Sequence, residues 1–224
     1  MGLSIVHNAD CLEAMRAMDG NAFDLAIVDV PYGIGEDGGR FRDRKGGGHR
    51  VLPKKHWDSE SPSQTYFDEL FRVSQNQIIW GANHFIDKIA KPSAGWIYWD
   101  KLMGGDFADG ELAWTSFERP LRAFRYCNKR GGAIHPTQKP ITLYKWLLTN
   151  YAKPGDTILD THLGSGSSRI AAYDLGFDFT GYELDKDYFD AQEERFAIHT
   201  AQARLFESVP EPIVETQSQL FGEV

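Results

Sequence analysis

The stretch TILDTHLGSGSS, residues 157–168, decides the fold. It opens with an apolar run typical of a buried strand, which ends at Asp160. Gly164 and Gly166 follow, and residues 169–175 then carry the apolar spacing of a helix. A strand that leads through a glycine turn into a helix lets a ligand approach the backbone, and the free N–H groups of the helix start favour a carboxylate or phosphate. The stretch therefore predicts an α/β fold with a ligand at this turn.

An acidic residue follows at the spacing expected of a nucleoside site. The sequence DFTGYE, residues 178–183, predicts the next strand and ends in Glu183, near the usual offset of about 20 residues. A carboxylate at this position suits the hydroxyls of a ribose. Glycine turns between strands and helices are common, however, so this pattern alone is equally compatible with a turn that binds no nucleoside.

Two further motifs precede this stretch in the chain, DVPYG at residues 29–33 and HPTQKP at residues 135–140. The continuous apolar run FDLAIV, residues 23–28, predicts a strand buried on both faces that delivers DVPYG to the carboxyl edge of the sheet. Open α/β sheets bind their ligands at that edge. Taken alone, DVPYG reads as a proline turn with a solvated aspartate.

The three motifs in this order resemble the S-adenosylmethionine-dependent amino-methyltransferases of DNA, in the permuted group where the catalytic tetrapeptide precedes the cofactor-binding half. The resemblance covers roughly residues 3–200. It implies one doubly wound, Rossmann-like α/β domain whose mostly parallel, seven-stranded sheet carries helices on both faces. It also implies S-adenosylmethionine as the cofactor and double-stranded DNA as the substrate.

The resemblance assigns a set of residues to the cofactor. Asp10 would lie at the adenine, although Asp10 with Glu13 also has the spacing of a helix capping box. Thr137 and Lys139 would border the methionine part, and the alternative for Lys139 is a surface lysine at a helix start. The full set is Asp10, Cys11, Thr137, Lys139, Asp160, Gly164, Ser165, Gly166, Ser167 and Glu183.

The tetrapeptide Asp29, Val30, Pro31 and Tyr32 would carry the catalysis. An exocyclic amine shares its lone pair with the base ring and is a poor nucleophile. A carboxylate from Asp29 and the backbone carbonyl of Val30 would accept its two hydrogens and hold it in line with the methyl group. Tyr32 would stack on a base flipped out of the duplex. Val30 replaces the first of two usual prolines but keeps the carbonyl, so we expect activity to survive.

The sequence leaves two questions open: which amine is methylated, and whether the protein is catalytically active. Asp29 favours adenine N6, because the cytosine-N4 enzymes of this group more often carry serine there. Cytosine N4 stays the close alternative, since both amines need the same two acceptors. Thr161 and His162 replace a usual Pro-Phe pair, and with Val30 they leave open a non-catalytic accessory protein that binds cofactor and DNA. We expect His162 to be neutral and packed, and no histidine has metal-ligand spacing.

Two segments inside the domain carry the basic residues expected to contact DNA. Residues 33–57 form a glycine-rich loop, a basic flap that either grips phosphates or is simply a solvated surface. Residues 102–134 are the candidate target-recognition segment; because both are small, we expect a short recognition site, weak specificity or a homodimer. The candidate contacts are Arg40, Arg42, Arg44, Lys45, Arg50, Lys54, Lys55, Arg122, Arg125, Lys129 and Arg130.

Three local predictions concern other elements. Ser61-Pro62 would open a helix, and residues 186–203 would form a helix whose Phe189 and Phe196 cover the sheet. Lys101 would pair with Asp100.

Composition limits the class of protein. The 224 residues are 42% hydrophobic, enough for one domain at residues 1–206, with a flexible tail at 207–224. A net charge of −8 argues against a protein that coats nucleic acid without specificity. Two distant cysteines and the lack of a signal peptide or apolar membrane span predict a cytoplasmic protein. The resemblance implies one encoded by a bacterium, archaeon or phage.

The tail ends in a sequence that predicts a partner. Gln217, Leu220 and Phe221 resemble the short peptide by which bacterial proteins dock on the replicative sliding clamp, although a tail without a partner is an equal alternative.

A peptide of residues 213–224 should bind clamp in a fluorescence polarisation assay, and replacing Leu220 and Phe221 with alanine should abolish binding. Unchanged binding of the double variant would refute the motif.

Overall fold

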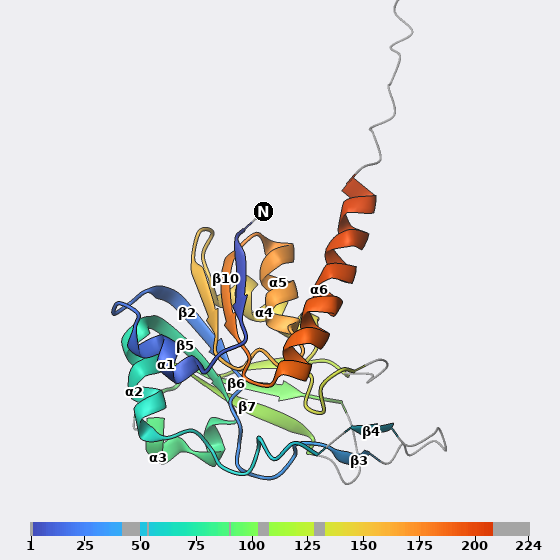
Figure 1. The fold of residues 1–224 in the computed structure, drawn as a ribbon. Coiled ribbons are helices and arrows are strands. Elements are labelled where there is room, and N and C mark those ends of the chain that lie inside the picture. Colours follow the sequence, from blue (N-terminus) through green and yellow to red (C-terminus); the bar gives the residue numbers. More distant parts are fainter. Residues whose placement is uncertain are drawn as a thin grey trace, which may run out of the picture.

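One open sheet organises the fold, and the computed structural model describes residues 2–41, 50–52, 54–89, 91–102, 108–127 and 133–207. Within these residues the sheet has eight strands (Figure 1). In spatial order they are β1 (Ser4–His7), β10 (Asp178–Tyr182), β9 (Thr157–Asp160), β2 (Phe23–Val28), β5 (Ser74–Trp80), β7 (Gly110–Thr115), β6 (Trp96–Asp100) and β8 (Arg122–Arg125).

Most neighbouring strands run parallel, as the resemblance implies. Only β7 runs against its neighbours β5 and β6. The expected count of seven was one too low, because β8 extends the sheet by pairing parallel with β6. The segment 102–134 is consequently less of an insert than expected, since its described residues supply β7 and β8 to the main sheet.

The two halves of the chain meet at the centre of the sheet, where β2 pairs with β9. Leu25 lies opposite Ile158 and Ala26 opposite Leu159. From β9 the sheet continues through β10 to β1, and from β2 it continues the other way through β5. Such a reversal of strand order opens a crevice at the carboxyl ends of the central strands. Residues that follow β2 and β9 therefore meet at one edge.

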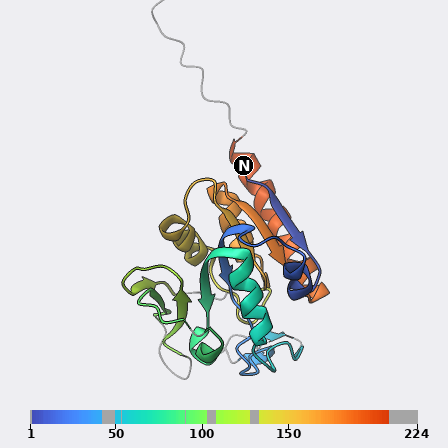
Figure 2. The ribbon, with the colours of Figure 1, turned by 90° about the vertical axis from the view of Figure 1, so that its left-hand side faces the viewer.

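Helices cover both faces of the sheet, as predicted (Figures 1 and 2). On one face the sheet packs with buried residues of α4 (Ile141–Tyr151) and α5 (Ser167–Leu175). On the other it packs with α1 (Cys11–Arg16), α2 (Gln64–Val73) and α3 (Ile86–Ile89). A short 3-10 turn, η1 (Ala82–His84), follows β5, and α6 (Lys186–Glu207) is the last of the described elements.

Two helices differ from their predictions. The N-cap of α2 is Ser63, not Ser61, because the Ser63 hydroxyl accepts the Tyr66 N–H at 3.4 Å. Helix α6 packs against α5, and its most buried side chains are Tyr188 and Gln192, so the expected sheet-covering stripe of phenylalanines was wrong. A polar contact face suits α6, because it lies against the glycine turn that precedes α5.

The described residues of the basic flap include a two-stranded ribbon. Within residues 33–57, β3 (Gly39–Phe41) and β4 (Arg50–Leu52) pair antiparallel, apart from the main sheet. Residues 42–49 lie outside the described ranges, as does the tail from residue 208 onward with its predicted clamp motif. None of the helices in the described ranges has the length and apolar character that crossing a membrane requires.

Candidate active site

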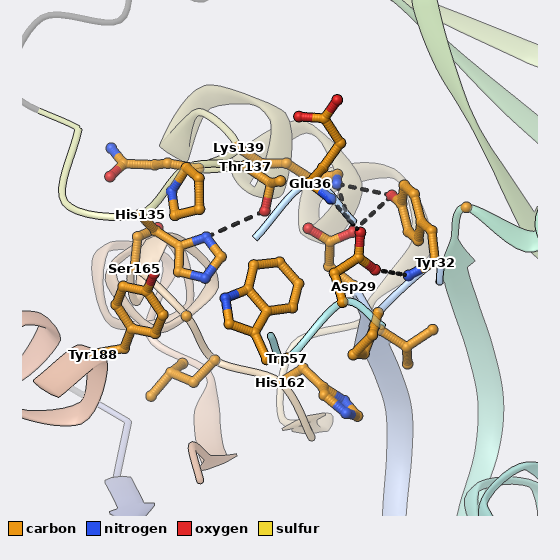
Figure 3. Close-up of a pocket in the computed structure, with 18 of the residues that line it drawn as sticks. Asp29, Tyr32, Glu36, Trp57, His135, Thr137, Lys139, His162, Ser165 and Tyr188 are labelled. Carbon is orange, nitrogen blue, oxygen red and sulfur yellow. Dashed lines mark hydrogen bonds and ion pairs between the residues drawn. The ribbon is translucent and has the colours of Figure 1, made fainter. Parts of the chain in front are cut away.

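A cavity of about 1200 Å³ lies at the carboxyl edge of the sheet, where β2 and β9 end. It brings together all three motifs and the base of the flap (Figure 3). All four residues of the tetrapeptide line it. Seven of the ten predicted cofactor residues line it as well: Asp10, Cys11, Thr137, Lys139, Gly164, Ser165 and Glu183. Asp160, Gly166 and Ser167 stand behind this wall and shape the turn instead.

Asp29 is held by two donors from different motifs. Its Oδ1 accepts a hydrogen bond from Lys139 Nζ at 2.5 Å and one from the Tyr32 hydroxyl at 2.8 Å. Lys139 is only 3% exposed, so the surface-lysine alternative is wrong. The HPTQKP motif thus neutralises the carboxylate of DVPYG.

The Asp29–Lys139 pair belongs to a larger charge cluster, in which Lys139 is buried and the other members are half-buried. Lys139 Nζ also lies 2.8 Å from Glu111 Oε2, and Lys101 Nζ lies 2.6 Å from Glu111 Oε1. The expected Lys101–Asp100 pair was wrong, because Asp100 instead faces Arg125 at 3.5 Å. In the β6–β7 pairing Glu111 lies opposite Trp99. Trp99 precedes Lys101 by two residues, so this register brings Glu111 close to Lys101. Two ammonium groups therefore balance two carboxylates.

Burial and pairing set the protonation of this charge cluster. Burial raises the pKa of Asp29 above its usual range, with help from the charge of Glu111 and against the attraction of Lys139. Burial also acts to raise the pKa of Glu111, but Lys139 and Lys101 outweigh it and lower that pKa to about 2. Against its own burial, Lys139 has a raised pKa because it faces both carboxylates. Lys139 is therefore charged at neutral pH.

Two acidic side chains fix the backbone conformation of the glycine turn through hydrogen bonds. Gly164 and Gly166 adopt positive φ values of 53° and 71°, which favour glycine. The Glu183 carboxylate accepts the Gly164 N–H at 2.8 Å, and it also accepts the Asp185 N–H at 2.8 Å. Asp160 accepts the His162 N–H at 3.0 Å and the Ser168 hydroxyl at 2.5 Å. These bonds fix the backbone where a ligand would approach it.

The residues that depart from the family pattern are accommodated by hydrogen bonds. Thr161 Oγ1 lies 2.6 Å from the Tyr66 hydroxyl and 2.9 Å from His162 Nδ1. Burial lowers the pKa of His162 to about 4, so this histidine is neutral, as expected. Val30 is fully packed in the core on the α2 side of the sheet. All three side chains are therefore either packed or hydrogen-bonded in this structure.

Asp10 and Cys11 line the cavity at the start of α1. Asp10 caps the helix by accepting the N–H groups of Leu12 at 2.7 Å and Glu13 at 3.3 Å. The reciprocal half of a capping box is absent among the described bonds of Glu13, which pairs with Arg16 at 2.6 Å. Burial, with the nearby Asp10 charge, raises the pKa of Cys11 to about 12, so this cysteine is an inert thiol.

The predicted DNA contacts divide into three groups. Lys55 turns inward, because its ammonium lies 2.6 Å from both Asp185 and Asp187 at the start of α6, so it is not a free phosphate contact. Lys54, Arg122 and Arg125 are exposed. The side chains of the remaining candidates, Arg40, Arg42, Arg44, Lys45, Arg50, Lys129 and Arg130, lie outside the described part of the structure, as do the tail residues Gln217, Leu220 and Phe221.

Sequence reasoning missed several residues that line the cavity. Glu111 is an acidic residue in an otherwise apolar strand, which is the one signal that would have marked it. Trp57, whose ring lies 5.1 Å from that of His135, and Asp58 carried no signal beyond their place after the flap. In the described ranges no cluster of histidine, cysteine or acidic residues has the arrangement of a metal site.

Comparisons with known proteins agree with this geometry. The profile of the family described as DNA methylase matches residues 79–194. A methylase of Escherichia coli (strain K12), YubD, is 27% identical over 210 residues, which cover 84% of this chain and 88% of that protein.

Solved structures share the fold. The M1.HpyAVI–SAM complex is 19% identical with a TM-score of 0.58, and the alignment covers 86% of this chain and 98% of that one. The cytosine-N4-specific PvuII DNA methyltransferase is 13% identical with a TM-score of 0.57, covering 90% and 93%.

Replacing Asp160 with asparagine should change how stability depends on pH. Burial raises the pKa of Asp160 from 3.8 to about 7, so between these values the folded chain keeps a proton that the unfolded chain has lost. The carboxyl therefore favours folding below about pH 4, and this contribution, up to about 4 kcal/mol, is lost as the pH rises to 7. Urea unfolding of Asp160→Asn should vary less with pH across this window; identical pH profiles would contradict the shift.

Proposed function

Because this chain belongs to the DNA methylase family, we propose that it transfers a methyl group from S-adenosylmethionine to the exocyclic N6 amine of adenine in DNA. The observation that carries the proposal is the Asp29 carboxylate, which stands in the cavity beside the glycine turn and is held by Lys139 and Tyr32. Methylation of an amine requires an ionised carboxylate, here charge-balanced by Lys139, next to the glycine turn that would bind the cofactor.

The residues around the turn fit S-adenosylmethionine, which supplies the electrophilic methyl group when it is bound. The cavity has room for a nucleoside and a base, and Gly164, whose φ of 53° favours glycine, lines it. Glu183 would hold the ribose, Asp10 the adenine, and Thr137 and Ser165 the methionine part. The structure of M1.HpyAVI, a relative in fold, is a complex with this cofactor, which supports the assignment.

The tetrapeptide would act by accepting the hydrogens of the target amine. Both bonds described above end on Oδ1 of Asp29, so its Oδ2 keeps acceptor capacity for one amine hydrogen, and the Val30 carbonyl would take the other. Charge-assisted acceptors strengthen as the nitrogen becomes positive during transfer. The Asp29 carboxylate would then take the proton that the methylated amine releases.

Lys139 would keep this carboxylate in its acceptor form. A protonated Asp29 would present a donor to the amine and lose its function. The Lys139 ammonium at 2.5 Å favours the ionised carboxylate against the effect of burial. Glu111 and Lys101 hold Lys139 in place from behind. This role differs from the cofactor contact that the sequence assigned to Lys139.

The base would reach the cavity by flipping out of the duplex, because the amine is inaccessible inside it. Tyr32 would stack on the base, and its own ring is held in place by stacking on His84 at 5.1 Å with planes 15° apart. Exposed Lys54, Arg122 and Arg125 would meet the phosphates. Asp29 favours adenine as the target. Cytosine N4 is the second candidate, and likeness to the cytosine-N4-specific PvuII enzyme favours it.

The proposal predicts a methylated nucleoside. Incubation of the chain with mixed-sequence duplex DNA and labelled S-adenosylmethionine, followed by nucleoside mass spectrometry, should yield 6-methyladenine. A 4-methylcytosine product would keep the mechanism and replace the base. No product, with cofactor binding confirmed by calorimetry, would instead favour the non-catalytic accessory protein.

The proposal also predicts that Asp29→Asn lowers kcat by about 100- to 1000-fold, because one acceptor oxygen becomes a donor. Cofactor affinity should change little, because Asp29 would face the target amine and not the cofactor, and Lys139 keeps Glu111 as a partner. Single-turnover methylation and calorimetry measure the two quantities. Asp68→Asn, the same exchange on the exposed face of α2, is the matched control. Lost cofactor binding in Asp29→Asn would reassign the residue to the cofactor site.

A further inference from the structure

A carboxylate outside the three motifs organises the backbone that follows the catalytic tetrapeptide. Asp58 is 2% exposed. Its Oδ1 accepts the backbone N–H groups of Tyr32 at 2.6 Å and Gly33 at 2.8 Å, and its Oδ2 accepts the N–H of Glu36 at 2.8 Å. Hydrogen bonds to an ionised acceptor are roughly twice as strong as neutral ones. The turn after Tyr32 is therefore folded around this one side chain.

The local sequence is shaped for this arrangement. Gly33 and Gly35 both have φ of +76°, a conformation that other residues rarely adopt. The Gly35 N–H donates to the Asp58 carbonyl at 3.0 Å, and a Cβ on Gly33 would come within 3.0 Å of the Ser61 backbone nitrogen. The two glycines let residues 32–36 close around Asp58 without a steric clash.

The bond to Tyr32 is the one that bears on catalysis. Pro31 has no N–H, so the first backbone donor after Val30 is that of Tyr32. Asp58 holds the peptide unit between Pro31 and Tyr32. Because the Pro31 ring fixes φ, this bond also restrains the preceding peptide unit, which carries the Val30 carbonyl, and the Cα that bears the Tyr32 ring. Catalytic groups lose activity steeply when they move by about 1 Å, so such a restraint has a direct effect on rate.

Asp58 also closes the neck of the basic flap, because β3 and β4 lie between Glu36 and Asp58 in the chain. Two residues shortly before Asp58 in the chain, Lys55 and Trp57, contact the other half of the molecule. Lys55 binds Asp185 and Asp187 at the start of α6, and the Trp57 ring enters the cavity beside His135 (Figure 3). The end of the flap is thus tied to the catalytic half by Asp58 and to the cofactor half by Lys55.

We propose that Asp58 is a positioning residue for methyl transfer, which fixes the backbone of the catalytic tetrapeptide at the point where the flap begins and ends. This role rests on the proposed function. Asp58 touches neither the target amine nor the methyl group; it acts through the N–H groups of Tyr32, Gly33 and Glu36. It is therefore required for the rate of transfer and not for cofactor binding.

The first test is the kinetic effect of Asp58→Asn. Asparagine keeps the shape but presents an NH₂ group to at least one of the three N–H donors, which breaks that bond. We expect kcat to fall about 10- to 100-fold, as for a small displacement of catalytic groups, with the Kd for S-adenosylmethionine within about threefold of the wild-type value. Asp68→Asn again serves as the control and should match the wild type in both quantities.

The second test is independent of activity. Hydrogen–deuterium exchange of the full chain should show slow exchange at the amides of Tyr32, Gly33 and Glu36, and faster exchange at these positions in Asp58→Asn. Unchanged exchange would overturn the restraint itself. Faster exchange with an unchanged kcat would overturn the positioning role, and so would a parallel loss of cofactor binding and thermal stability, which would mark Asp58 as a general structural residue.

The two tests separate this role from the proposed function. If the wild type transfers no methyl group to DNA, the proposed function fails and the positioning role fails with it, while the exchange data still decide whether the restraint exists. If the wild type is active and Asp58→Asn is equally active, only the role of Asp58 fails.

Discussion

The parallel pairing of β2 with β9 is the constraint on which the rest of the structure depends. It joins two segments far apart in the chain and makes Asp29 and Asp160 emerge at the same edge of the sheet. Because strand order reverses there, the edge opens into a cavity instead of being filled by a crossover connection. Every feature of the candidate site, from the glycine turn to the neck of the flap, is built around that opening.

The charge cluster beside this opening is costly to bury, and its geometry explains why it is tolerated. Lys139 stands between Asp29 and Glu111, and Lys101 completes the balance. Removing one member would leave an uncompensated buried charge, so the four groups support one another. Such a cluster adds little to stability compared with an apolar core, and we interpret it as serving the chemistry of Asp29.

The flap contributes residues to the candidate active site as well as to the surface that we propose for DNA. Its basic residues suggested either phosphate contacts or a solvated surface. Its last residue, Trp57, lines the cavity, Lys55 binds the cofactor half, and Asp58, directly after the flap, binds the catalytic half. An arrangement of this kind would link contact with DNA to the geometry of the tetrapeptide. It also accounts for Lys55, which sequence reasoning grouped with the DNA contacts and which is half-buried in its pair with Asp185.

The sequence by itself determined the strands β2 and β9, the glycine turn, the motif order and Asp29, because hydrophobic periodicity and backbone requirements are local properties. Only the tertiary structure decided the partners. Glu111 reaches Lys139 through the β6–β7–β5 pairing, Asp58 reaches Tyr32 across the flap, and β8 adds an eighth strand at the edge. These contacts depend on long-range register, and no local pattern specifies which distant charge or N–H group a buried carboxylate will meet.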